Sequence, residues 1–192
     1  MQRVGILGGT FDPVHVGHVA AAAEARAACR LDRVLLVPAG DPWQKTGHVV
    51  ASAGDRMEMV EAAAAAVDGI EPSSVEVDRT GPTVTADTLE VLAGPDRRLF
   101  LVLGSDAVRN MSTWRRLEDT KRLATVVVID RLGERVDPPG EGWTVEHVPI
   151  PRMDMSSTEL RERLEQGRPV DGWIPPAVVR VIRERGIYTA PR

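Results

Sequence analysis

The sequence predicts an α/β fold in which a doubly wound parallel sheet is followed by C-terminal helices. Three observations support this prediction. Short apolar runs rich in Val, Ile and Leu alternate with longer helical stretches, as in a sheet built from strand, helix and strand units. A glycine-rich turn joins the first apolar run to the first helical stretch. Two further helical stretches close the sequence.

The expected strands are the apolar runs that turn residues bound on both sides. They comprise residues 4–7, 34–37, 75–77, 99–103 and 126–129, and residues 143–148 are a candidate sixth strand. The expected helices comprise residues 19–30, 56–67, 86–92, 116–123, 157–166 and 176–185, with Gly186 placed to end the last one. Parallel strands are joined by crossover connections, so their carboxyl ends lie at the same edge of the sheet. The loops after the first, second and fourth strands should therefore meet at that edge, where such sheets bind ligands.

Length and composition favour a single domain spanning residues 1–192. A chain of this size buries about 70% of its unfolded surface without needing disulfides. The lone cysteine, Cys29, lies in an apolar helical stretch and cannot form an internal disulfide, which favours a reducing compartment. Neither a secretory leader nor an apolar run of roughly 18 residues is recognisable. We therefore expect a cytoplasmic protein with no membrane partner.

The formal charge of −4 at pH 7 argues against a nucleic-acid partner, because such proteins usually carry a basic excess. A small anionic ligand is compatible with this charge if cationic side chains gather locally. The sequence has no Cys/His cluster of the kind that binds structural zinc. His48 and His147 show no ligand spacing with each other or with acidic residues, and we assign them no chemistry.

The turn after the first expected strand is the most informative segment. Gly8, Gly9, Thr10 and Phe11 follow the strand and lead toward a new helix. The unpaired backbone N–H groups of a helix start and the helix dipole together favour a phosphate group at this junction. These four residues are therefore candidates for binding a polyphosphate.

Two histidines three residues apart stand at the start of that helix. His15 and His18 should share one face, and Gly17 between them lets a nucleotide approach closely. This combination resembles the (H/T)xGH signature of the nucleotidyltransferase superfamily. The resemblance implies a Rossmann-like fold, ATP binding by the glycine turn and Gly17, and catalytic roles for both histidines. A dinucleotide-binding motif is disfavoured, because the glycine spacing is wrong for it.

A segment before the penultimate helix carries a second motif. Ser156 and Glu159 have capping-box spacing, which predicts a helix start. The segment resembles the (I/M)SSTxxR motif of the same superfamily. The resemblance implies that Ser156, Ser157 and Thr158 bind the ATP phosphates and that Arg161 is catalytic. The alternative is an ordinary capped helix with a surface arginine.

The end of the fourth expected strand carries a third motif. Gly104 and Asp106 resemble the LGxD element of the superfamily, which implies contacts with the nucleotide. Asp106 is also placed to cap the helix that follows. We expect Asp106 to fill both roles.

One branch of the superfamily makes nicotinate adenine dinucleotide, and residues 78–88 resemble its RxGxSYTxDT segment. The resemblance implies that Thr85 binds the pyridine carboxylate and that Trp114 stacks near the pyridine ring. Lys45 is the expected partner of the mononucleotide phosphate, although the histidine of the branch's PHK-like tripeptide is missing here. The alternatives are a threonine N-cap, a core tryptophan and an exposed lysine.

These motifs together resemble the bacterial nicotinate-mononucleotide adenylyltransferases over nearly the whole sequence. The resemblance implies adenylyl transfer from ATP to nicotinate mononucleotide, with Mg²⁺ bound through ATP and no dedicated protein metal ligand. Phosphopantetheine adenylyltransferase and a dual-specificity enzyme for nicotinamide and nicotinate mononucleotides are alternatives. A nucleotide-binding sensor without catalysis is the alternative from another class. The sequence leaves open whether the protein is a homo-oligomer.

Overall fold

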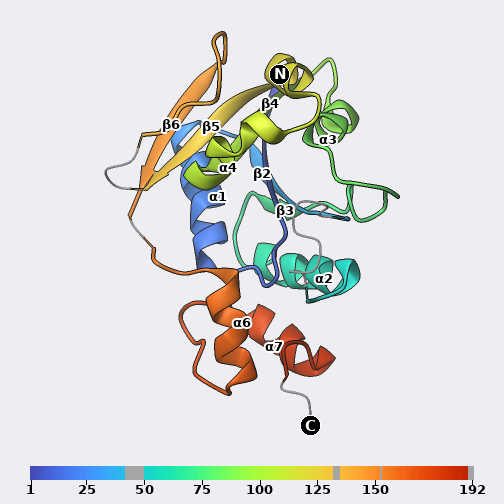
Figure 1. The fold of residues 1–192 in the computed structure, drawn as a ribbon, viewed down its shortest axis with the longest axis vertical. Helices are drawn as coiled ribbons and strands as arrows, with labels where there is room; N and C mark the ends of the chain where they lie inside the picture. Colours follow the sequence, from blue (N-terminus) through green and yellow to red (C-terminus); the bar gives the residue numbers. More distant parts are fainter. Residues whose placement is uncertain (42–49, 132–134, 152, 190–192) are drawn as a thin grey trace.

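The computed structural model describes residues 1–41, 50–131, 135–151 and 153–189. Its centre is a six-stranded sheet with the order β3-β2-β1-β4-β5-β6, in which every neighbouring pair is parallel. The strands are β1 Gln2–Gly9, β2 Arg33–Pro38, β3 Ile70–Pro72, β4 Arg97–Gly104, β5 Ala124–Arg131 and β6 Val145–Ile150. This order confirms the doubly wound sheet predicted from the sequence (Figure 1).

The helices follow the predicted alternation. They are α1 Val16–Ala28, α2 Ala53–Ala64, α3 Thr85–Leu92, α4 Ser105–Arg109, α5 Leu117–Leu123, α6 Ser157–Glu165 and α7 Pro176–Arg185, with a 3₁₀ turn at Met111–Thr113. Both α1 and α2 begin earlier than predicted, because His15 and Ser52 already adopt the extended N-cap conformation. Gly186 ends α7 with a positive φ of 64°, as predicted.

The sheet is sandwiched between two helical layers, each with its own apolar core. On one face, Val102 of β4 belongs to the cluster that includes residues of α1, α2, α6 and α7. On the other face, its neighbour Leu101 belongs to the cluster that includes residues of α3 and α4. Alternate residues of one strand therefore serve opposite layers, as expected for a buried strand. The two C-terminal helices lie beyond one end of the sheet, where α7 packs against α2 (Figure 1).

The crossover direction reverses between β1 and β4, which lie side by side at the centre of the sheet. Ligands in doubly wound sheets bind beyond the carboxyl ends of the strands at this switch point. The loop from β1 to α1 and the start of α4 both lie there. No helix among the described residues is long and apolar enough to span a membrane.

The third strand was predicted in the wrong place. Residues 75–77 were expected to form it, whereas they lie in a turn and β3 is the short edge strand Ile70–Pro72. The turn lies tightly against the loop after β2, since a Cβ built on Gly40 would lie only 2.1 Å from the carbonyl oxygen of Glu76. The apolar alternation around Glu76 therefore reflects tertiary packing of a turn and not strand pairing.

Candidate active site

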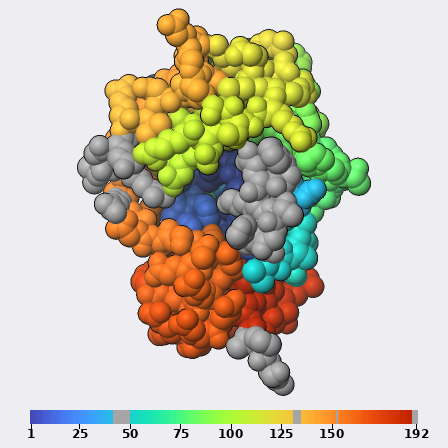
Figure 2. Space-filling view, in the orientation of Figure 1, coloured from blue at the N-terminus to red at the C-terminus, as the bar shows by residue number. Residues whose placement is uncertain are grey.

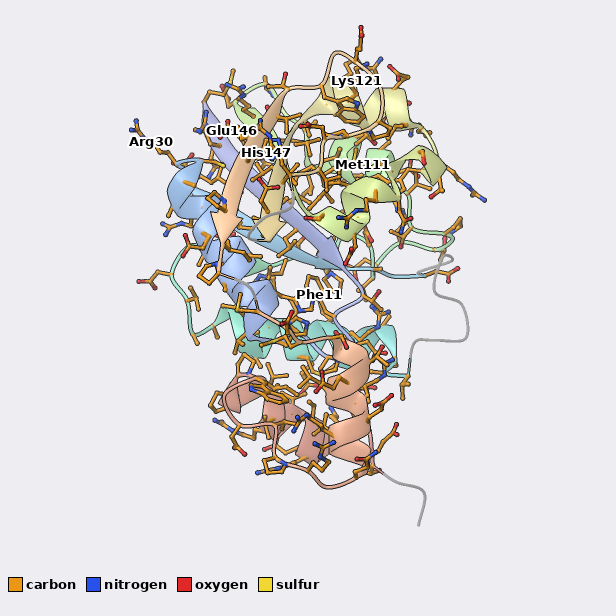
Figure 3. The ribbon with its side chains drawn as sticks, turned by 60° about the vertical axis from the view of Figure 1, so that its left-hand side comes forward. Phe11, Arg30, Met111, Lys121, Glu146 and His147 are labelled. Carbon is orange, nitrogen blue, oxygen red and sulfur yellow. The ribbon has the colours of Figure 1, made fainter. Side chains whose placement is uncertain are left out.

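The loop after β1 is held in an unusual backbone conformation. Phe11 has a positive φ of 52° although it is not a glycine, and its side chain is only 1% exposed. Its ring lies against the backbone of Gly9, where an added Cβ would come within 3.1 Å of the ring. The Phe11 ring also meets His18 edge-on, with ring centroids 4.9 Å apart. Figure 3 shows Phe11 between the sheet and the C-terminal helices.

The two predicted histidines lie together at the start of α1. His15 is the N-cap residue, His18 lies in the first turn, and their rings stack with centroids 3.7 Å apart. The backbone N–H of His15 donates a hydrogen bond to Nδ1 of His18 over 3.2 Å. Because Nδ1 accepts this bond, the proton of the neutral His18 ring is on Nε2. The His18 ring is therefore oriented as a hydrogen-bond donor through Nε2.

The glycines around the histidine pair keep space open. A Cβ on Gly17 would lie 3.0 Å from Nδ1 of His15, so a side chain at this position would displace the His15 ring. A Cβ on Gly8 would meet no atom within 4 Å, because Gly8 faces open space at the end of β1. The loop therefore presents backbone to a ligand at Gly8 and accommodates imidazole at Gly17.

The start of α6 is docked on the loop between β1 and α1. Ser157 donates its hydroxyl proton to the carbonyl oxygen of Pro13 over 3.0 Å. Arg161 donates to the carbonyl oxygen of Asp12 over 2.7 Å and to the hydroxyl of Thr158 over 3.3 Å. Ser156 caps the helix by accepting from the backbone N–H of residue 159, as its spacing predicted. Arg161 is 15% exposed, so it is not the surface arginine of the alternative interpretation.

Asp12 connects this loop to distant segments. Its carboxylate is 2% exposed and accepts hydrogen bonds from the backbone N–H groups of Val50 and Ala51 and from the hydroxyl of Tyr188. Arg161 lies 3.5 Å from the same carboxylate. Burial, together with the bond to Asp12, raises the pKa of Tyr188 above its ordinary value. Asp12 thus holds the histidine loop to α6 and to the C-terminal segment.

A buried arginine supports the same loops and was missed by the sequence analysis. Arg56 of α2 is 1% exposed and donates hydrogen bonds to the carbonyl oxygens of Thr10, Gly40 and Ala51. Burial lowers the pKa of Arg56, while the nearby Asp12 carboxylate opposes this shift. A polar residue within a helical pattern reads as a solvated side chain, so the sequence offered no signal for this role.

A cavity of about 240 Å³ opens beside the glycine turn. It is lined by Gly8, Gly9 and Thr10 from the loop after β1 and by Thr85 and Trp114 from the segments around α3 and the 3₁₀ turn. The structure thus brings the predicted phosphate-binding turn and the predicted pyridine-binding residues to one cavity. Thr85 is the first helical residue of α3 and Val84 is the N-cap, so the threonine N-cap alternative is wrong.

The expected cap at the fourth strand is also wrong. Gly104 is the N-cap of α4, whereas Asp106 lies within the first turn and pairs with Arg109 over 3.0 Å. Gly104 takes this position because its extended backbone continues directly from β4 into the helix. The Asp106 carboxylate is 76% exposed beside the carboxyl end of the sheet. Lys45 and His48 lie outside the described residues.

Figure 2 shows a hollow in the face of the molecule between α4 and α6. N-terminal residues form its visible floor, which is consistent with the position of the loop after β1. Within the described ranges, no cluster of three or more His, Cys, Asp or Glu side chains could hold a metal ion.

Glu76 is a second residue that the sequence analysis missed. It lines the cavity, is 6% exposed, and accepts a hydrogen bond of 2.6 Å from the hydroxyl of Thr88. Burial raises the pKa of Glu76, although hydrogen bonds from Thr88 and Thr83 and the charges of Arg79 and Arg56 oppose the shift. The cavity therefore contains a carboxyl group that is costly to ionise.

Replacing Glu76 with Gln should stabilise the protein at neutral pH. Because the pKa of Glu76 is raised in the folded state, the free energy of unfolding of the unmodified protein falls as pH rises from the ordinary glutamate pKa through the raised pKa. Below about pH 4 both states are protonated, and this cost disappears. Urea unfolding of both proteins across a pH series measures the difference. A difference that does not change with pH would contradict this prediction.

Known proteins resemble this chain over most of its length. A family model described as cytidylyltransferase-like matches residues 6–163. A relative from Roseiflexus sp. (strain RS-1) named "Probable nicotinate-nucleotide adenylyltransferase" is 42% identical over 193 residues, which cover 96% of this chain and 97% of the relative. A relative of the same name from Saccharopolyspora erythraea is 40% identical, with coverage of 97% and 90%.

Solved structures share the fold. The Plasmodium falciparum nicotinic acid mononucleotide adenylyltransferase complexed with NaAD matches 98% of each chain with a TM-score of 0.79 and 18% sequence identity. The same parasite protein complexed with APC matches with a TM-score of 0.78. At this identity the similarity establishes the architecture.

Proposed function

The chain belongs to the cytidylyltransferase-like family, and its relatives include proteins named "Probable nicotinate-nucleotide adenylyltransferase". On this premise we propose that it transfers the adenylyl group of ATP to nicotinate mononucleotide. The 5′-phosphate of the mononucleotide attacks the α-phosphorus of ATP. A new phosphorus–oxygen bond forms, the bond to the β-phosphate breaks, and pyrophosphate leaves. The observation that supports this best is the stacked histidine pair that follows the glycine turn, since that turn lines one cavity together with Thr85 and Trp114.

The reaction requires positioning and charge stabilisation but no covalent enzyme intermediate, because a phosphate dianion is already a nucleophile. His18 donates from Nε2 to an oxygen of the α-phosphate as negative charge develops there. The bond from the His15 backbone to Nδ1 of His18 keeps that proton on Nε2. His15 stacks on His18 and serves the β- and γ-phosphate side.

The ATP phosphates lie against two helix starts in this proposal. Backbone groups of the glycine turn and the start of α1 provide donors for an anion. The start of α6 adds Ser156, Ser157 and Thr158, and Arg161 faces the leaving pyrophosphate from the same helix. Support comes from the bonds of Ser157 and Arg161 to the histidine loop, which hold the two helix starts together. Gly104 and Asp106 form the nucleoside side of the site.

A magnesium ion accompanies ATP in the proposed reaction. Mg²⁺ favours phosphate oxygens and keeps several of its waters, so it can arrive bound to the nucleotide. The described residues provide no cluster of metal ligands, and we assign no protein side chain to the ion. When bound, the ion neutralises phosphate charge. We further propose that the 192 residues act as one cytoplasmic domain without a nucleic-acid partner.

The mononucleotide is expected to bind with its pyridine ring beside Trp114 and its carboxylate at the start of α3. The N–H groups and hydroxyl at Thr85 can all donate to a carboxylate, whereas an amide presents its own N–H₂ group to the same donors. A buried donor without a partner costs about 1–3 kcal/mol. Nicotinate mononucleotide should therefore exceed nicotinamide mononucleotide in kcat/KM by at least about tenfold.

Pyrophosphate release with ATP and each candidate acceptor tests this proposal. Nicotinate mononucleotide, nicotinamide mononucleotide and phosphopantetheine distinguish the three enzyme interpretations. Thr85→Val should narrow the acid-to-amide ratio, and Trp114→Ala should weaken both pyridine substrates together. Equal kcat/KM for acid and amide would indicate a dual-specificity enzyme, and no turnover with any acceptor would favour a nucleotide sensor.

A further inference from the structure

We infer that Arg115 strengthens the preference for the acid mononucleotide, beyond what the donors at Thr85 provide, by pairing with the pyridine carboxylate at the rim of the cavity. The inference rests on the proposed function. It adds a positively charged side chain to the two pyridine-binding residues, Thr85 and Trp114, that the resemblance implies. Arg115 lines the same cavity as Thr85 and Trp114 and follows Trp114 directly in the chain.

The cavity is an unfavourable environment for a carboxylate that has no countercharge. Most of its lining is apolar, including Ile6, Leu89, Leu101 and Leu103. Removing a carboxylate from water into such surroundings is costly unless a countercharge or several donors receive it. Hydroxyl and backbone groups at the start of α3 provide donors but no full positive charge.

Glu76 makes the need for a countercharge greater. Its buried carboxyl group lines the same cavity, and two carboxylates in one cavity disfavour each other's ionisation. Arg56 and Arg79 act electrostatically on Glu76, but neither lines the cavity.

Among the described residues that line the cavity, Arg115 supplies the only positive charge. Arg115 is an exposed residue, so placing its charge at the edge of the cavity costs little desolvation. A guanidinium can meet a carboxylate with two parallel N–H donors, which an amide substituent cannot match. The pairing therefore favours the acid over the amide.

The rim segment is anchored on both sides of Arg115. Trp114 packs against the apolar core that includes Leu89 of α3. Arg116 adopts a left-handed φ of 56° and forms ion pairs with Asp87 and Glu90 of α3. Because α3 also begins at Thr85, these contacts hold the rim beside the helix start that receives the carboxylate.

The substitution Arg115→Gln tests the inference, with Arg122→Gln as the matched control. Arg122 lies on α5, is 70% exposed and does not line the cavity. Initial rates at saturating ATP give KM and kcat for nicotinate and nicotinamide mononucleotides. We expect Arg115→Gln to raise KM for the acid about tenfold while changing KM for the amide less than about twofold. Arg122→Gln should leave both values unchanged, and Arg115→Lys should recover part of the loss.

Both pyridine substrates carry the 5′-phosphate, and only one carries the carboxylate. An equal rise in KM for both would therefore place Arg115 at the phosphate and overturn the inference. Unchanged selectivity in Arg115→Gln would overturn it as well. The unmodified protein provides the separate test of the proposed function, since its failure to form a dinucleotide would refute that function whatever the variant does. Isothermal calorimetry with each mononucleotide checks the same selectivity without turnover.

Discussion

His18→Ala is expected to lower kcat about 100-fold while leaving the KM for ATP nearly unchanged. The Nε2 proton of His18 is fixed by the bond that Nδ1 accepts from the His15 backbone, so the ring is oriented as a donor before the substrate binds. A preorganised donor to a developing oxyanion contributes on the order of 3 kcal/mol to catalysis. Steady-state rates of pyrophosphate release measure this loss as a decrease in kcat.

Two further variants separate catalysis from packing at this position. His18→Gln places an amide N–H₂ near the position of Nε2 and should recover part of the lost kcat. His147→Ala is the control for removing an imidazole, because His147 lies on β6 and pairs with Asp130 and Asp137 (Figure 3). If His18→Ala kept near-normal kcat per folded molecule and lost only stability, the histidine pair would be a packing feature of the turn.

The region that sequence could predict best is the junction of β1 and α1. Its structure depends on contacts within a few residues: Gly17 makes room for the ring of His15, and that residue caps the helix that carries His18. Local geometry of this kind is encoded by spacing alone. The doubly wound parallel sheet could be predicted for a related reason, because alternating apolar strands and helices permit few connections.

The third strand could not be placed from its residues. Val75 and its neighbours have the alternating pattern of a strand, but Val75 packs against the core formed around α3 while the backbone turns. The actual strand, Ile70–Pro72, is short and pairs only with β2 at the sheet edge. Proline is tolerated at such an edge but weakens the sequence signal for a strand.

The contacts of the buried charged residues in the site also could not be predicted from the sequence. Asp12 meets Tyr188 across 176 residues, and Arg56 meets Thr10 across 46. Such pairs depend on how the helical layers pack. They leave no recognisable pattern within a short stretch of sequence. The pairing of His147 with Asp130 and Asp137, which showed no ligand spacing, has the same cause.

Arg56→Met should lower the free energy of unfolding by about 3 kcal/mol or more. Methionine has a similar length and suits an apolar interior, so the substitution removes the donors with little change in volume. The carbonyl oxygens of Thr10, Gly40 and Ala51 then lose the guanidinium that joins them. Each buried acceptor left without a donor costs on the order of 1–3 kcal/mol. Urea unfolding followed by circular dichroism measures the change.

The loss should extend to activity, because Arg56 joins the loops that leave β1 and β2 at the ligand edge of the sheet. At a temperature where Arg56→Met is still folded, we expect kcat/KM for ATP to fall as the loop after β1 loosens around the histidine pair. Arg56→Lys retains the charge but cannot supply the planar fork of donors. Its kcat/KM should therefore lie between the values for the unmodified protein and for Arg56→Met. Arg185→Met removes an exposed ion pair with Glu58 instead, and it should change little. Equal stability of Arg56→Met and Arg185→Met would show that the three carbonyl bonds do not hold the loops in place.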